Sequence, residues 1–281
     1  MRCNHTIGHS NGLVCYLRGK DLFTYTPSSP WTYFSLEICN PSRLEKLIIA
    51  SRIQVHYDIC GFQFGYNILN SEYKVMCIAN YKDEYEYLIY TVGSTQPWRK
   101  IKNPWLKHRP IYDVLSGEWA CRPISCNGTL FYCMIKEENV EEKTRVLVSF
   151  DLTDEQFQEI KPPSEEFVGY LDEGDFYHLE YKGCFCCAIM KQFDPFNGKV
   201  DLHILKDAIK HVWFRETVNF NISSEFGSTT IIAGCRNIMC FSDQVILDWR
   251  LRNEQNNHVM LLYNVLTKEF FKNLSNGVDY R

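Results

Sequence analysis

The sequence contains no long apolar run. No stretch approaches the roughly 18 consecutive apolar residues that a membrane-spanning helix needs, so we expect no membrane partner. The N-terminus, MRCNHTIGHSNG, lacks the apolar segment of a secretory signal peptide. The 13 cysteines form an odd set spread along the chain, whereas secreted disulfide-rich domains usually carry an even set. We therefore expect reduced cysteines and a cytoplasmic or nuclear location.

An excess of positive charge is also missing. The 30 Lys and Arg residues are outnumbered by 34 Asp and Glu residues, which gives a formal net charge of -4. Proteins that bind nucleic acid usually present a basic face, because phosphate contacts supply much of their affinity. The charge therefore gives no reason to expect a nucleic-acid partner.

Sequence motifs for catalysis are absent. The chain has no G-x-S-x-G nucleophile turn, no H-E-x-x-H pair, no Walker loop and no G-x-G-x-x-G loop. The eight His are scattered. Asp151 and Asp154 are interpreted as turn residues, because Asp side chains readily bond to their own backbone. We expect no catalytic residue, no cofactor and no enzyme activity.

Metal-ligating residues do not occur at the spacing of a known metal module. Cys184, Cys186 and Cys187 form C-x-C-C within an apolar stretch, whereas metal sites usually present C-x-x-C pairs. In a strand Cys184 and Cys186 face one side and Cys187 the other, so we interpret all three as buried strand residues. Four further possible ligands lie near the N-terminus: Cys3, His5, His9 and Cys15. We expect this end of the chain to be frayed. We expect no metal.

Helical periodicity is nearly absent, and the best helix candidate is LKDAIKHVW at 205–213. Aromatic residues reach 15%, and aromatic and β-branched side chains favour strands. Short apolar runs between turn residues predict strands. The predicted strands are 13–18, 22–26, 72–79, 85–92, 129–135, 145–150, 183–190 and 245–251.

A degenerate repeat joins these strands. Each unit has a turn, a strand, a longer loop, a second strand, and then an aromatic residue that precedes a short closing strand. The closing aromatics recur at intervals of about 60 residues, a spacing typical of propeller blades; they are Trp31, Trp98, Phe157, Trp213 and Phe270. The blade-opening turns include Asn11-Gly12, Asn127-Gly128 and Lys182-Gly183. The repeat favours one β-propeller domain over residues 1–281, and an irregular β-sandwich is the alternative.

Long connections are expected at 37–60, 102–124 and 136–144. The acidic run 137–143 is interpreted as a solvated hairpin loop. The loop at 102–119 is rich in residue types common at interface hot spots, namely Trp and Arg. We predict partner binding by this loop, with local packing of the tryptophans as the alternative. The predicted contact residues are Trp105, His108, Arg109 and Trp119.

Several short motifs follow one another in an order that resembles the F-box associated domain of plant F-box proteins, in particular its type 3 branch. The family shares G-F-G-Y-D, then N-x-E-Y-K-V and W-R, and then S-F-D-L-x-x-E-x-F after an N-G-x-L-Y-W strand. This sequence departs from the pattern at Gln63, Asn67 and Cys133. The matching strings are SNGLVCY (10–16), FTYTPSS (23–29), GFQFGYNILNSEYKV (61–75), TVGSTQPWRKI (91–101), SCNGTLFYC (125–133), SFDLTDEQFQEI (149–160), YKGCFCC (181–187) and HILKD (203–207).

The resemblance implies a kelch-like β-propeller of about five to six four-stranded blades that binds a protein target. It also implies that ubiquitin-ligase chemistry belongs to other subunits, a Skp adaptor and a cullin, which an F-box recruits. No helical F-box segment precedes the first predicted blade, so we expect those partners only if an F-box is supplied. The alternatives are a propeller-type enzyme or carbohydrate-binding propeller, and an inert fragment whose first blade lacks its closing strand.

Overall fold

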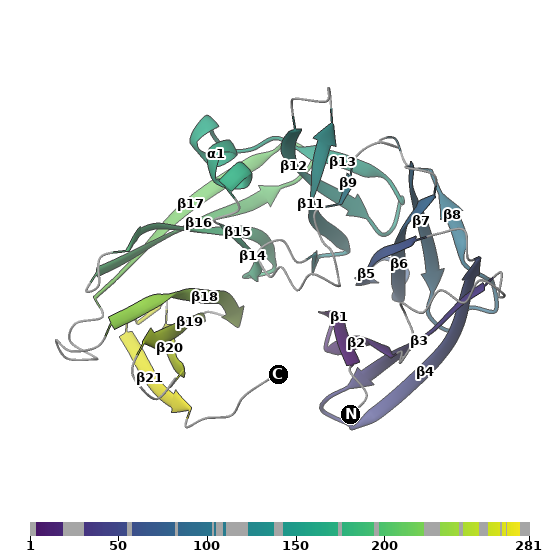
Figure 1. Ribbon diagram of the computed structural model, residues 1–281, viewed down its shortest axis with the longest axis horizontal. Coiled ribbons are helices and arrows are strands. Elements are labelled where there is room, and N and C mark those ends of the chain that lie inside the picture. The colour runs from purple at the N-terminus through teal and green to yellow at the C-terminus, as the bar shows by residue number, and fades with distance from the viewer. Residues whose placement is uncertain are drawn as a thin grey trace. The chain divides into compact units, whose positions relative to one another are not determined.

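The computed structural model describes residues 4–18, 31–54, 58–81, 84–102, 104, 109–110, 123–137, 143–173, 176–193, 197–221, 231–241, 244–252, 258–264, 266–267 and 269–275. The chain divides into two compact units. Figure 1 labels their helices and strands where there is room. Unit 1 comprises residues 1–118 and 123–160. Unit 2 comprises residues 119–122 and 161–281.

Unit 1 contains three antiparallel sheets. The first contains β1 (Asn4–Ser10), β2 (Leu13–Arg18), β3 (Trp31–Asn40) and β4 (Glu45–Gln54). The second contains β5 (Asp58–Asn67), β6 (Glu72–Tyr81), β7 (Glu84–Thr91) and β8 (Arg99–Ile101). The third contains β10 (Ile124–Cys126), β11 (Thr129–Glu137), β12 (Lys143–Asp151) and β13 (Phe157–Ile160), and β9 (Arg109–Pro110) also pairs with β11.

Unit 2 contains two antiparallel sheets and the helix α1 (Glu165–Glu173). The fourth sheet contains β14 (Phe176–Tyr181), β15 (Cys184–Phe193), β16 (Asn197–Asp207) and β17 (Val212–Asn221). The fifth contains β18 (Ile231–Phe241), β19 (Gln244–Arg252), β20 (His258–Asn264) and β21 (Glu269–Ser275).

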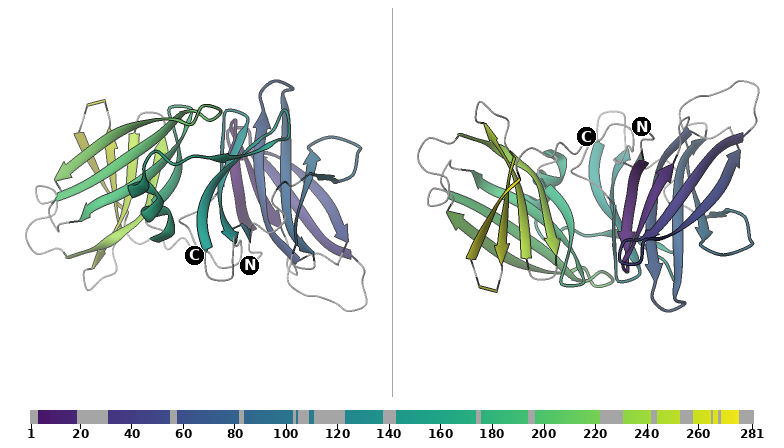
Figure 2. Two further views of the ribbon diagram at one scale, coloured as in Figure 1. Left: turned by 90° about the horizontal axis from the view of Figure 1, so that it is seen from above. Right: turned by 90° about the horizontal axis from the view of Figure 1, so that it is seen from below.

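In every sheet the four main strands pair in chain order, so each sheet is an antiparallel meander (Figure 2). A four-stranded meander that recurs along the chain is the blade of a β-propeller. The described residues form five such sheets, within the predicted range. The predicted fold class is confirmed, whereas the prediction that the chain is a single domain stays a prediction.

The predicted strands and turns fall where the sequence placed them, apart from 22–26, which lies outside the described residues. The Asn11-Gly12, Asn127-Gly128 and Lys182-Gly183 turns each join two paired strands. All six residues have positive φ, between 45° and 78°. Both central residues of a type I′ turn require positive φ, which Gly and Asn accept most readily.

Four other hairpins share a second kind of turn. An Asn or Asp ends the first strand, its side chain accepts a main-chain N–H two or three residues later, and the fourth residue after it has positive φ. These pairs are Asn40 with Leu44, Asn67 with Ser71, Asp151 with Glu155, and Asp207 with His211. The interpretation of Asp151 as a turn residue is confirmed by the bonds that Thr153 N and Asp154 N donate to its Oδ1.

The helix predicted at 205–213 is wrong, because the segment forms the hairpin between β16 and β17. Its turn begins with Asp207, whose Oδ1 accepts a bond from Lys210 N (2.9 Å). An Asp at the start of a helix accepts the same kind of bond from a backbone N–H of the first turn. The described helix is α1, where Ser164 Oγ accepts a bond from Phe167 N (3.3 Å) and Glu165 and Glu166 follow. The sequence signal that indicates this helix is the capping residue Ser164 followed by acidic residues in the first turn.

Three further expectations for the first sheet are wrong. The segment 37–60 is not one long connection, because β4 occupies Glu45–Gln54 and supplies the closing strand. The described part of the N-terminus is not frayed, because β1 pairs with β2 from Asn4 to Ser10. Trp31 does not precede the closing strand, because it opens β3, the third strand of its sheet.

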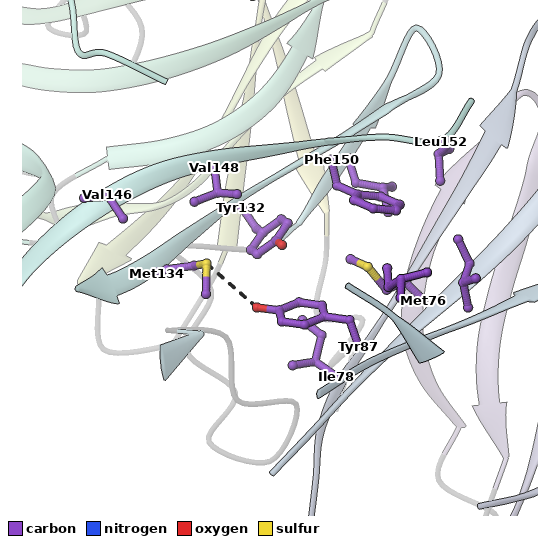
Figure 3. Packing of buried hydrophobic residues seen from close by; sticks show 12 residues of the cluster. Met76, Ile78, Tyr87, Tyr132, Met134, Val146, Val148, Phe150 and Leu152 are labelled. Atoms are coloured by element: carbon purple, nitrogen blue, oxygen red, sulfur yellow. Dashed lines mark hydrogen bonds between the residues drawn. The ribbon is translucent and has the colours of Figure 1, made fainter. Parts of the chain in front are cut away.

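Two apolar layers join the three sheets of unit 1. Val75 and Cys77 of β6 face the first layer, with Phe34 and Leu36 of β3. Met76 of β6 faces the second layer, as do Ile78, Tyr87 and residues of β11 and β12 (Figure 3). Strand β6 therefore lies between two cores, which explains its unbroken apolar run VMCIA.

The aromatic residues at the start of two closing strands, Trp98 just before β8 and Phe157 at the first position of β13, pack against the neighbouring sheet. Trp98 contacts Phe34 of the first sheet at a centroid distance of 5.9 Å. Phe157 contacts Tyr87 of the second sheet at 4.8 Å. Both side chains therefore fill space between two neighbouring sheets of unit 1.

A charged pair recurs on the outer half of three sheets. An acidic side chain on the third strand is buried and forms an ion pair with a base on the fourth strand. Each base lies opposite the residue two positions after the acid. The pairs are Glu37 with Lys46, Glu86 with Lys100, and Asp201 with Arg215.

Asp201 makes the stability of unit 2 sensitive to acid. Burial raises the pKa of its carboxyl, but hydrogen bonds from Thr217 and Arg215 outweigh burial and leave the pKa below its ordinary value. A lowered pKa in the folded state contributes stability above the unfolded pKa, near 4, that is lost as the pH falls. We predict that Asp201→Asn flattens the decline of the melting temperature between about pH 5 and pH 3. Parallel declines for both proteins would contradict this.

Candidate partner-binding surface

The predicted contact loop lies largely outside the described residues. Trp105, His108 and Trp119 belong to that part of the chain. Arg109 lies in β9, where its backbone pairs with Ile135 of β11. The assignment of these four residues to partner binding stays a prediction.

The structure brings a different set of residues together, where the first two strands of each sheet in unit 1 meet at a turn. The β5–β6 turn lies beside the other two: a Cβ on Gly128 would be 3.8 Å from Ile68 N, and the Tyr73 hydroxyl donates to Asn11 O (3.1 Å). We call this group the inner turn surface. It comprises Asn11, Gly12, Ile68, Leu69, Asn70, Asn127 and Gly128.

Asn67 fixes the β5–β6 turn. It is fully buried, and its Oδ1 accepts bonds from Leu69 N (3.2 Å) and Asn70 N (3.4 Å). The same oxygen accepts a bond from Thr153 Oγ1 (2.9 Å), and Nδ2 donates to Leu152 O (3.2 Å). One amide therefore holds the turn and also ties the second sheet to the third.

A buried charge reinforces this connection. Lys74 is 5% exposed, and its Nζ donates to Leu152 O (2.6 Å) and Glu155 Oε1 (2.9 Å). Arg99 also pairs with Glu155. Burial raises the pKa of Glu155, but the bonds from Arg99 and Lys74 outweigh burial and leave the pKa below its ordinary value. Glu155 therefore remains charged at neutral pH and links β6, β8 and the β12–β13 turn.

A third connection runs beneath the inner turns. Ser10 Oγ lies 3.0 Å from Ser125 Oγ and accepts a bond from Tyr66 N (3.1 Å), which links β1, β10 and β5. A Cβ on Gly65 would lie 2.7 Å from Leu152 Cδ1 and 2.9 Å from Ser125 Oγ. A larger residue at position 65 would have to displace these side chains, so glycine allows the third sheet to approach β5 closely.

Two apolar side chains stand on this rigid base. Ile68 is 53% exposed and Leu69 is 79% exposed, and both lie in the turn that Asn67 holds. Single exposed apolar residues are ordinary, but adjacent ones on a fixed turn offer contact area without a large loss of conformational freedom on binding. Binding residues are commonly carried on loops that a rigid scaffold positions. The inner turn surface is therefore the best-defined candidate site in the described part of the chain.

The described cysteines are mostly buried and are not grouped with other metal-ligating side chains. Burial, with a smaller contribution from Cys39, raises the pKa of Cys15 to about 12, so its thiol stays protonated. Cys186 and Cys187 are buried as predicted, while Cys184 is half-buried beside Lys206. Within the described ranges, no three His, Cys, Asp or Glu side chains are grouped as metal ligands. None of the described helices is long and apolar enough to cross a membrane.

The geometry defines a β-propeller-type scaffold with a rigid, partly apolar turn surface. The sequence profile of the F-box associated beta propeller domain matches residues 1–279. The chain therefore belongs to that family, as its motifs predicted.

The relatives are plant F-box proteins. The F-box protein At3g52320 of Arabidopsis thaliana is 26% identical over 221 residues, which cover 74% of this chain and 47% of that protein. The F-box protein At3g07870 of the same plant is 26% identical over 232 residues, which cover 75% of this chain and 49% of that protein. The chain thus spans about half the length of these relatives.

Likeness to solved structures is weak. The crystal structure of the polysaccharide lyase Uly1 has a TM-score of 0.44 and 8% identity, and the match covers 93% of this chain and 58% of that one. A likeness at this level carries no argument about function.

The family motifs supply the framework of the site. Asn67 and Lys74 come from GFQFGYNILNSEYKV, Arg99 from PWRKI and Glu155 from SFDLTDEQF. Sequence reasoning used these motifs for recognition and did not infer that their polar residues meet. The available signal was Lys74, which stands two positions after Glu72 in an apolar strand motif. A Lys that is buried in such a strand requires polar partners, so its presence indicates that other polar residues lie close to it.

Lys74 offers a direct test of the framework. We predict that Lys74→Met lowers the free energy of unfolding by about 2 kcal/mol, because Glu155 and the carbonyl of Leu152 lose their bonds to the buried ammonium and keep only those from Arg99 and Asn67. The control, Lys46→Met, removes a base from the more exposed pair with Glu37 and is expected to cost less than about 1 kcal/mol. Urea titration followed by circular dichroism measures both, and equal losses would contradict the proposed framework.

Proposed function

We propose that this chain is the target-recognition domain of an F-box type protein, and that the inner turn surface contacts the target. The observation that supports the proposal is the exposed pair Ile68 and Leu69 on a turn fixed by the fully buried Asn67. Membership of the F-box associated family supplies the context. The domain acts by binding and not by catalysis, in the cytoplasm or nucleus.

Coupling to ubiquitin transfer belongs to other parts of the assembly. The names of the relatives describe F-box proteins, and this chain spans about half of their length. We propose that an F-box supplied with this domain recruits a Skp adaptor and a cullin, while the propeller selects the protein to be modified. A propeller-type enzyme or a carbohydrate-binding propeller has no specific support among the described residues.

The first experiment compares protein capture by matched variants. We predict that the double change Ile68→Ser and Leu69→Ser reduces recovery of a specific target from plant cells at least tenfold, because the main apolar contact area of the turn is lost. Leu44→Ser is the control, because Leu44 is also highly exposed but lies in the β3–β4 turn. Quantitative mass spectrometry of the tagged proteins measures recovery. Targets that bind all three proteins equally would argue against the inner turn surface.

A second experiment tests ligase coupling separately. We predict that attaching the F-box of the At3g52320 relative to the chain adds a Skp adaptor and a cullin to the recovered proteins, while the chain alone recovers the target without them. Polyubiquitin on the target should increase only with the fusion. Recovery of the adaptor without any gain in target ubiquitylation would contradict the proposed role in ligase recognition.

A further inference from the structure

The hairpin between β16 and β17 in unit 2 carries a second exposed apolar group. Ile209 is 81% exposed, Val212 is 47% exposed and Phe214 is 55% exposed. Val212 and Phe214 are two residues apart on β17 and therefore face the same side of the strand. Ile209 lies in the turn immediately before them. Three bulky apolar side chains within six residues form a patch of the kind that marks interaction surfaces.

The patch has a rigid support. Between the exposed residues, Trp213 packs against Phe167 of α1 at a centroid distance of 5.6 Å, and its Nε1 donates to Lys161 O (2.8 Å). Lys161 N in turn donates to His211 Nδ1 (3.4 Å). The turn itself is closed by the bond from Lys210 N to Asp207 Oδ1 (2.9 Å). A partner would therefore meet an ordered surface, which reduces the entropy lost on binding.

Exposed lysines lie near the patch. Lys206 and Lys210 lie in the hairpin and are exposed, and Lys161 is joined to it through His211 and Trp213. The Lys206 ammonium lies 3.8 Å from Cys184 Sγ, which places this hairpin beside the turn that carries the exposed Lys182. The acidic residues of the hairpin have partners of their own: Asp207 pairs with Lys210 (3.9 Å), Asp201 pairs with Arg215, and Glu216 accepts a bond from the Tyr181 hydroxyl (3.1 Å). Exposed lysines therefore lie in and beside this hairpin turn, in a chain whose net charge is negative.

We propose that this patch and the lysines near it bind an acidic protein segment that contains bulky apolar residues. The lysines complement the carboxylates of such a segment, and Ile209, Val212 and Phe214 contact its apolar side chains. This site goes beyond the proposed function, because it does not use the inner turn surface and names the chemistry of the bound segment. Most of the affinity should depend on apolar contact, while the lysines favour acidic segments and increase the association rate.

Fluorescence anisotropy with a defined probe tests the proposal. The probe is a labelled peptide with three Asp residues on each side of a Phe-Leu pair. We expect it to bind the full 281-residue chain, and we expect Phe214→Ser, or Lys206→Glu with Lys210→Glu, to weaken binding at least tenfold. Leu266→Ser is the matched control, because Leu266 is an exposed apolar residue of another turn in unit 2. Circular dichroism confirms that each variant is folded.

Two peptide controls and one variant separate the explanations. Replacing Phe-Leu by Ser-Ser, or the Asp residues by Lys, should abolish binding. Retained binding of the Ser-Ser peptide would show attraction by charge alone and overturn the site, as would a lack of probe binding. Self-association that is lost with Phe214→Ser, without peptide binding, would assign the patch to a second copy of the chain instead. The Ile68 and Leu69 double variant should bind the probe normally. The result of this peptide test therefore does not depend on whether the inner turn surface binds a target.

Discussion

A four-stranded sheet has two faces, and the free energy of this fold depends on covering both with apolar side chains. In unit 1 the second sheet shows the constraint most clearly, because alternate residues of β6 enter two different apolar layers. A strand that is buried on both sides has no solvent-facing side for polar residues. The sequence VMCIA is therefore a continuous apolar run and does not alternate between apolar and polar residues. The same holds for FCCAI in β15, whose five residues are all buried. Among the described residues the buried Gln63 amide has no hydrogen-bond partner, whereas at a few other buried or half-buried positions polar side chains bond to defined partners.

Asn67, Lys74 and Glu155 are such positions, and their placement joins the fold to the candidate site. Apolar layers hold sheets together without fixing their register, whereas a buried amide and a buried ammonium require partners at defined distances. Leu152 O is the common acceptor, bonded by both Asn67 and Lys74. The interactions that position the third sheet on the second therefore also hold the turn that presents Ile68 and Leu69. A substitution in the exposed pair can change binding while this framework stays intact.

Strands such as β6, β12 and β15 could be predicted from sequence, because each is a short apolar run bounded by turn residues, whereas β4, β16 and β20 were not predicted. The Asn-Gly and Lys-Gly turns were predictable for the same local reason, since positive φ selects those residues. The hairpin at Asp207 was mistaken for a helix because the apolar residues of 205–213 recur at helical spacing across what is a turn between two strands. The inner turn surface could not be predicted, since the separation of Asn67 and Leu152 along the sequence gives no indication that they share a hydrogen bond. The loop with Trp105 and Trp119 was a prediction from composition alone, and it stays one.

The two candidate surfaces differ in a way that follows from their turns. Asn67 is buried and uses all its bonds to hold its turn against a neighbouring sheet, so Ile68 and Leu69 project from a largely uncharged surface. Asp207 is partly exposed and bonds only within its own hairpin among the described interactions, where exposed lysines lie near Ile209 and Phe214. The first surface is suited to apolar contact alone, and the second to apolar contact combined with negative charge on the partner. A repeated turn thus supplies a constant scaffold on which the residues after the Asn or Asp set the chemistry of binding.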